Sequence, residues 1–157
     1  GTPDAVYLLS TDSGYGFMIK LEDVYTKNRN GKLILKVPEN SNVLLPSKVN
    51  DIENDWIAAV SSIGRLLMFP ISELTLLPKG KGLKIIQIPP AKLKTREEYV
   101  VAVTAMRETD NLVIYTNKRH TVLKTREQEN FIGERGRRGA MLSRNFRNVI
   151  RISSEIE

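Results

Sequence analysis

The chain has 157 residues, of which 41% are hydrophobic and 27% are charged, a balance typical of one globular domain with a buried core. It contains no cysteine, which excludes disulfides and thiolate zinc sites, and no apolar run approaches the roughly 20 residues of a membrane-spanning helix. The net charge is +6 and its positive excess lies in residues 55–157, which suggests a polyanionic partner.

The first segment of the chain predicts a β-hairpin. Residues 5–11 and 15–21 are β-prone, and the turn tripeptide Asp12-Ser13-Gly14 separates them, with glycine supplying positive φ. Residues 33–37 predict a third strand. Residues 42–45 predict a fourth strand, which ends before Pro46.

The second segment repeats this plan. We expect strands at 56–61 and 65–70 around a turn at 62–64, and another strand at 84–88. The first of these strands is apolar at consecutive positions, which is typical of a strand covered on both faces. A charged connection follows at 92–98.

The third segment again begins with a continuous apolar strand. A short helix is expected within residues 124–132, because the sequence there is polar and free of strand formers. The β-prone or apolar segments of this unit are 99–106, 112–117, 120–123, 140–142 and 149–152.

A basic, glycine-containing element occurs three times, anchored at Gly31, Gly82 and Gly139, which lie 51 and 57 residues apart. A strand-rich unit of about 50 residues predicts a bladed all-β architecture. We therefore expect about three blade units of about four strands each, in an open arc. Their predicted bounds are residues 4–49, 55–91 and 99–153.

Catalytic patterns are missing from the sequence. The glycine segments lack the frame of a nucleotide-binding loop, and His120 has no evident catalytic partner. The acidic pairs Glu22-Asp23 and Glu97-Glu98 are expected to be solvated surface charge. We therefore expect no catalytic residue, no metal site and no cofactor in this chain, and no enzymatic activity of its own.

The basic loops predict phosphate binding, since Lys and Arg supply charge and glycine lets the backbone approach an anion closely. Aromatic residues are only 6% of the chain, which favours contacts to a duplex backbone over stacking on single strands. The alternative is that these cations only keep a β surface solvated. The predicted DNA-binding residues are Lys27, Arg29, Lys32, Lys79, Lys81, Lys84, Arg135, Arg137, Arg138, Arg144 and Arg147.

Five motifs in this order closely resemble the C-terminal domain of the ParC family, the larger polypeptide of bacterial DNA topoisomerase IV. The resemblance runs from about residue 4 to the end. Its motifs are Gly14-Tyr15-Gly16-Phe17, Asn30-Gly31-Lys32, Gly64-Arg65-Leu66-Leu67-Met68-Phe69-Pro70, Lys79-Gly80-Lys81-Gly82 and Gly133-Glu134-Arg135-Gly136-Arg137-Arg138-Gly139.

The resemblance implies a β-pinwheel, a propeller-like ring whose blades exchange strands with their neighbours. It implies a non-catalytic domain that binds and bends duplex DNA and helps to select DNA crossings for decatenation and relaxation. Because the family's domain has more blades, and because the chain starts at Gly1 without methionine, we expect residues 1–157 to be the C-terminal portion of a longer pinwheel.

The resemblance also implies a parent enzyme, an ATP-dependent DNA topoisomerase whose catalytic residues, ATP and Mg lie in other regions. The implied partners are duplex DNA, the rest of the ParC polypeptide, the ATPase polypeptide of topoisomerase IV, and chromosome-condensation proteins, with no membrane. The implied location is the cytoplasm, in association with the nucleoid.

Two alternatives stay open. The first is the C-terminal DNA-wrapping domain of gyrase, whose Gln-Arg-Arg-Gly-Gly-Lys-Gly box has no match here; residues 79–82 and 136–139 come nearest. The second is a propeller-like protein-interaction module that docks an acidic partner. Salt-dependent binding to random duplex DNA would separate the two classes of function.

Overall fold

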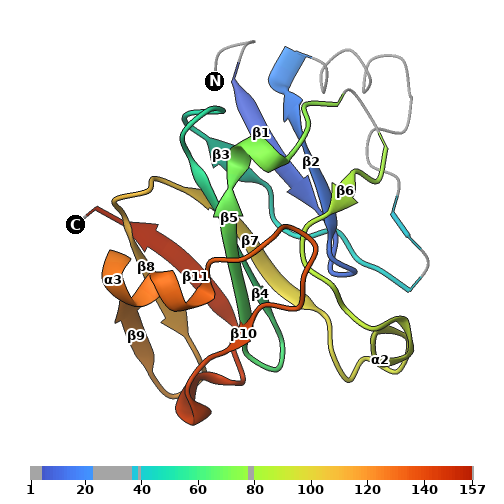
Figure 1. The fold of residues 1–157 in the computed structure, drawn as a ribbon. Coiled ribbons are helices and arrows are strands. Elements are labelled where there is room, and N and C mark those ends of the chain that lie inside the picture. Colours follow the sequence, from blue (N-terminus) through green and yellow to red (C-terminus); the bar gives the residue numbers. More distant parts are fainter. Residues whose placement is uncertain (1–4, 23–36, 39, 78–79, 157) are drawn as a thin grey trace.

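The computed structural model describes residues 5–22, 37–38, 40–77 and 80–156. Antiparallel sheets dominate the described part of the chain, as the all-β prediction requires (Figure 1). The helical elements are short: η1 (Ile71–Glu73), α2 (Pro90–Lys94), α3 (Thr125–Gln128), η2 (Glu129–Phe131) and η3 (Arg144–Phe146). The expected helix within 124–132 is confirmed by α3 and η2.

The first sheet is built on the predicted hairpin. Its register pairs Val6 with Lys20 and Leu8 with Met18. The strand order is β3 (Ser47–Val49), β1 (Val6–Ser10), β2 (Tyr15–Lys20) and β6 (Leu83–Lys84).

The second sheet contains the second predicted hairpin. Its strand order is β10 (Ala140–Met141), β5 (Arg65–Pro70), β4 (Trp56–Ser61) and β7 (Val100–Met106). Alternate residues of β4 enter two different core clusters: Ile57 and Ala59 pack towards the first sheet, and Ala58 and Val60 towards the third. This double burial explains why the strand is apolar at consecutive positions.

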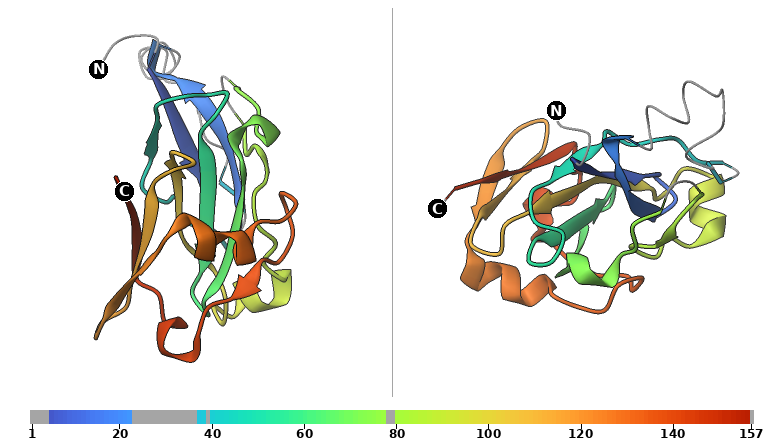
Figure 2. Two further views of the ribbon diagram at one scale, coloured as in Figure 1. Left: turned by 60° about the vertical axis from the view of Figure 1, so that its left-hand side comes forward. Right: turned by 90° about the horizontal axis from the view of Figure 1, so that it is seen from above.

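The third sheet has the order β11 (Arg151–Glu155), β8 (Asn111–Tyr115) and β9 (His120–Leu123). Figure 1 shows it on one side of the second sheet, with the first sheet on the other side. Strands β3, β7 and β11 of the three successive sheets lie next to one another in that order. In the right-hand view of Figure 2, α3 and β11 lie on opposite sides of the molecule.

Neighbouring units exchange strands, as the pinwheel prediction requires. The strand β6 follows the second hairpin in the sequence but pairs with β2 of the first sheet. The strands β7 and β10 both follow residue 98, and they complete the second sheet. Sheet membership therefore differs from the repeat in the sequence, and the unit bounds 4–49, 55–91 and 99–153 stay a prediction about that repeat.

Three local predictions were wrong or incomplete. In the segment 42–45, only Val43 makes an isolated bridge, to Thr11, and the strand β3 begins after Pro46. The strand expected at 84–88 is only Leu83–Lys84, because the chain then turns inward and buries Ile85 and Ile86. The connection after Pro89 begins with helix α2, since a proline at the first helical position favours a helix start. The strand expected at 33–37 lies almost entirely outside the described residues.

Candidate nucleic-acid interface

The two basic glycine loops that the structure describes lie at the seams where one unit lends a strand to the preceding sheet. Gly82 precedes β6 and Gly139 precedes β10, with φ values of 85° and 76°. A Cβ atom on Gly139 would lie 2.6 Å from the carbonyl oxygen of Leu66, and a Cβ on Gly82 would collide with the carbonyl of Gly16. These glycines therefore permit close approach to a neighbouring strand, where the sequence had suggested close approach to a phosphate.

The backbone hydrogen bonds at the two seams correspond. The amide of Ile85 donates to the carbonyl of Gly14 at 2.6 Å, and the amide of Leu142 donates to the carbonyl of Gly64 at 2.8 Å. Leu83 pairs with Gly16 at the first seam, as Ala140 pairs with Leu66 at the second. The two loops therefore occupy equivalent positions, as the repeat predicted.

Each of the three predicted arginines of the 135–138 loop already has a protein partner. Arg135 donates from Nη1 to the carbonyl of Lys84 at 2.8 Å. Arg137 forms an exposed ion pair with Glu134 at 3.1 Å. Arg138 forms a bidentate pair with Glu98, with N–O distances of 2.8 and 2.9 Å, and also donates to the carbonyl of Gln87.

The burial of Glu98 corrects the sequence prediction for the pair Glu97-Glu98. Glu97 is exposed, but Glu98 has 0% relative exposure and meets the guanidinium of Arg138. A buried carboxylate needs such a partner, since removing an ion from water is costly. The sequence carried no signal for this pair because its members lie 40 residues apart.

The other predicted cations vary in how far they are committed. Lys81 lies over the ring of Tyr15, with Nζ 4.6 Å from the ring centroid, and Lys84 is exposed beside it on β6. Arg147 is exposed but donates from Nε to the carbonyl of Leu142. Arg144 is exposed on η3. Lys27, Arg29, Lys32 and Lys79 lie outside the described residues.

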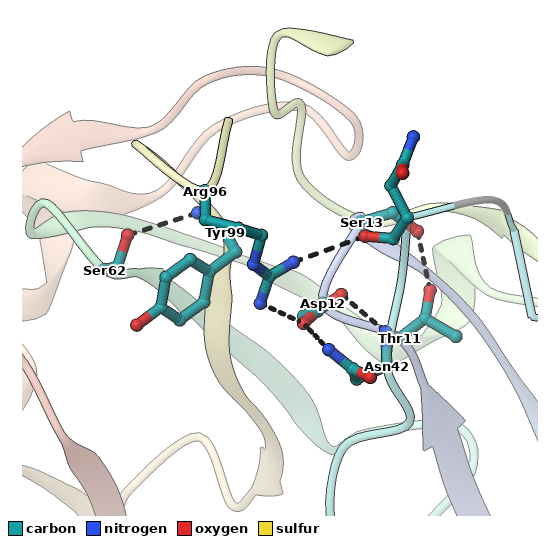
Figure 3. A network of polar contacts seen from close by, with 8 residues as sticks. Thr11, Asp12, Ser13, Asn42, Ser62, Arg96 and Tyr99 are labelled. Carbon is teal, nitrogen blue, oxygen red and sulfur yellow. Dashed lines mark hydrogen bonds and ion pairs between the residues drawn. The ribbon is translucent and has the colours of Figure 1, made fainter. Parts of the chain in front are cut away.

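Sequence reasoning missed a polar network that ties the first hairpin turn to the connection between the second and third units (Figure 3). Asp12 is buried and accepts a hydrogen bond from Arg96 at 2.7 Å and from the amide of Asn42 at 2.8 Å. The amide of Val100 donates to the carbonyl of Asp12. Arg96 also stacks over Tyr99, 4.3 Å from the ring centroid. Asp12 and Arg96 therefore act as structural residues at a seam.

Within the described residues, no cluster of three or more His, Cys, Asp or Glu side chains could hold a metal ion. No helix in that same part of the chain is long and apolar enough to cross a membrane. His120 is exposed and stacks with Tyr115, with ring centroids 5.8 Å apart.

Comparison with known sequences finds one family model, described as the DNA gyrase C-terminal domain, beta-propeller, which matches residues 7–48 and 55–105. The chain is 45% identical over 146 residues to the A subunit of DNA topoisomerase 4 from Pseudomonas aeruginosa, covering 93% of this chain and 19% of that protein. It is 38% identical over 139 residues to the protein of the same name from Escherichia coli K12, covering 88% and 18%. The chain thus spans about a fifth of the length of these relatives.

Solved structures agree with the sequence comparison. The E. coli ParC C-terminal domain superposes with a TM-score of 0.85 at 31% identity, covering all of this chain and 63% of that one. A DNA gyrase A C-terminal domain superposes with a TM-score of 0.74 at 18% identity, covering 98% of this chain and 50% of that one, which shows likeness of fold.

Proposed function

Because the chain belongs to the family of DNA gyrase C-terminal domains with a beta-propeller fold, we propose that it binds and bends duplex DNA for a type IIA topoisomerase. The observation that carries the proposal is its similarity, over 93% of its length, to a DNA topoisomerase 4 polypeptide. The net charge of +6 supports the same conclusion, since phosphate contacts need excess Lys and Arg.

Within that class, we assign the domain to the ParC polypeptide of topoisomerase IV and not to gyrase. The relatives described above are DNA topoisomerase 4 polypeptides, and the chain has no match to the gyrase box. In the whole enzyme, the domain would help to select the DNA crossings that are transported in decatenation and relaxation. Its partners would be the rest of ParC and the ATPase polypeptide of the same enzyme, at the nucleoid in the cytoplasm.

This proposal gives the chain no chemical step of its own. ATP, Mg and the strand-cleaving residues would belong to other regions of the enzyme. The purified chain should therefore neither relax a supercoiled plasmid nor decatenate linked circles. Relaxation that persists through repeated purification, free of contaminating topoisomerase, would contradict this part of the proposal.

Duplex binding is tested by fluorescence anisotropy with a duplex of about 30 bp and random sequence, titrated with this chain at several salt concentrations. With about five to eight phosphate contacts, the slope of log K against log salt should be roughly −4 to −7, since each contact adds about −0.9. A scrambled duplex should bind equally well. Absent binding, or binding that salt does not weaken, would refute the proposal and favour a protein-docking module.

Bending is tested separately with the same duplex labelled at both ends. Saturation with the chain should raise the energy transfer between the two dyes, because a bent duplex brings its ends closer together. If the duplex is bound with unchanged energy transfer, the bending role fails and the binding role stands.

A further inference from the structure

A polar pocket that sequence analysis did not single out lies at the end of the third sheet. It is a cavity of about 290 Å³ between the β8–β9 turn and the segment that contains η3. Three cations line it, Lys118 and Arg119 from the turn and Arg144 from η3. The remaining lining residues are Thr116, Asn117, Asn145 and Asn148.

The three cations of this pocket are uncommitted. Lys118, Arg119 and Arg144 are exposed and form no ion pair with any described residue. The arginines of the 135–138 loop differ, because Arg137 pairs with Glu134 and Arg138 with buried Glu98. A phosphate would have to compete with a carboxylate at those two positions but not in the pocket.

The turn that carries two of the cations is held in one conformation. The hydroxyl of Thr116 accepts hydrogen bonds from the amides of Lys118 and Arg119, at 3.3 and 3.2 Å. The amide of Thr116 donates to the carbonyl of Arg119 at 2.8 Å. A preformed turn lowers the cost in conformational entropy of ordering these side chains on an anion.

The corresponding turns of the first two sheets have another task. Gly14 and Gly64 in those turns are buried and accept hydrogen bonds from the chain of the following unit. The third turn has no glycine and carries Lys118-Arg119 at its exposed tip. The repeat therefore changes here from a turn that docks protein to an open cationic turn.

We propose that this pocket, lined by Lys118, Arg119 and Arg144, holds phosphodiester groups of the bound duplex. The inference rests on the proposed duplex-binding function and names its main contact site. The lining favours DNA over an acidic protein, since it has no apolar side chain, whereas protein interfaces are usually anchored by buried apolar or aromatic residues. Contacts to a nucleic-acid backbone need only charge and hydrogen-bond donors.

The test uses the whole 157-residue chain with Arg119→Ala and Arg144→Ala combined. Losing two phosphate contacts should flatten the salt slope by about 1.8 and weaken binding about tenfold or more at moderate salt, equally for every duplex sequence. The matched control is Lys92→Ala with Lys94→Ala on α2, which removes the same charge from exposed positions outside the pocket. The control should keep the slope within about 0.5. Circular dichroism should show that both double variants keep the fold.

An unchanged slope in the pocket variant would overturn this inference while leaving duplex binding intact. Equal losses in both variants would also overturn it, because net charge would then govern binding. Failure of the unmodified chain to bind any duplex would instead refute the proposed function. Intact DNA binding together with lost binding to polyglutamate would identify the pocket as a dock for an acidic protein, which would overturn the phosphate assignment.

Discussion

Arg137 and Arg138 are neighbours in the sequence, yet they have different physical roles. Arg137 extends into solvent, and its pair with Glu134 is exposed on both sides, 72% and 77%. Such surface pairs contribute little to stability. Arg138 instead neutralises Glu98, whose side chain is only 1% exposed. Arg138 is therefore a structural residue of the second seam, although the sequence had grouped it with the DNA contacts.

Replacing Arg138 with Ala should lower the free energy of unfolding by about 3 kcal/mol, because it leaves a buried carboxylate without its partner. Replacing Arg137 with Ala should change it by less than about 0.5 kcal/mol. Urea denaturation measures both. The double variant Arg138→Ala, Glu98→Ala should be more stable than the sum of the single changes requires. Additive single effects would mean that the two side chains do not interact.

Asp51 allows a prediction about pH. Hydrogen bonds from the side chain of Asn54 and from the amides of Glu53 and Asn54 hold the pKa of this exposed carboxyl below its ordinary value of 3.8. The stabilisation is therefore present above the ordinary pKa and is lost as the pH falls through the lowered one. Replacing Asn54 with Ala should move the pKa of Asp51 up towards 3.8 in an NMR titration. A pKa that stays unchanged would show that the amides alone are responsible.

Among the individual strands, those at the seams are short and have few ladder bonds. The strands β6 and β10 have two residues each. Their position therefore depends on the preceding glycine, which lets the chain lie against the carbonyl of the neighbouring strand. A side chain at that glycine would displace the strand from the sheet.

Gly139→Ala and Gly136→Ala form a matched pair within one loop. Both glycines have positive φ, but a Cβ on Gly136 would meet no atom closer than 3.6 Å. Gly136→Ala should cost about 1 kcal/mol through backbone strain alone, and Gly139→Ala about 2–4 kcal/mol, because the Leu66 carbonyl must also move. Hydrogen exchange at the amide of Leu142 should accelerate only in the second variant. Equal costs would remove the close approach as the reason for glycine at 139.

Across the molecule, strand exchange joins the three sheets into one unit. One core cluster packs the first sheet on the second, and the other packs the second on the third. The second sheet takes β7 and β10 from residues beyond its own hairpin. The first two sheets of the described chain are therefore each completed by a strand from a later sequence repeat.

We expect one cooperative unfolding transition. The single tryptophan, Trp56, packs against the second cluster and reports on the second and third sheets by fluorescence. Far-ultraviolet circular dichroism reports on all sheets. The two urea curves should coincide, because loss of the third unit removes strands from the second sheet. An early tryptophan transition, followed by a later loss of dichroism, would show that the sheets unfold independently.

Features that depend on neighbouring residues could be predicted from the sequence alone. The hairpins around Gly14 and Gly64 follow from β-prone runs flanking a turn, and the helix after Leu123 follows from a polar stretch. The repeated glycine element and the ordered motifs predicted the bladed architecture and the family. These patterns are local or periodic, and they need no knowledge of which distant segments meet.

Contacts between distant segments became known only from the folded chain. The strand after Gly82 joins the first sheet, Glu98 is buried against Arg138, and Arg119 and Arg144 line one pocket. Each of these contacts joins residues at least 25 positions apart in the chain. Propensity and spacing do not specify such pairs, because they are selected by packing and by the burial of charge across the whole fold.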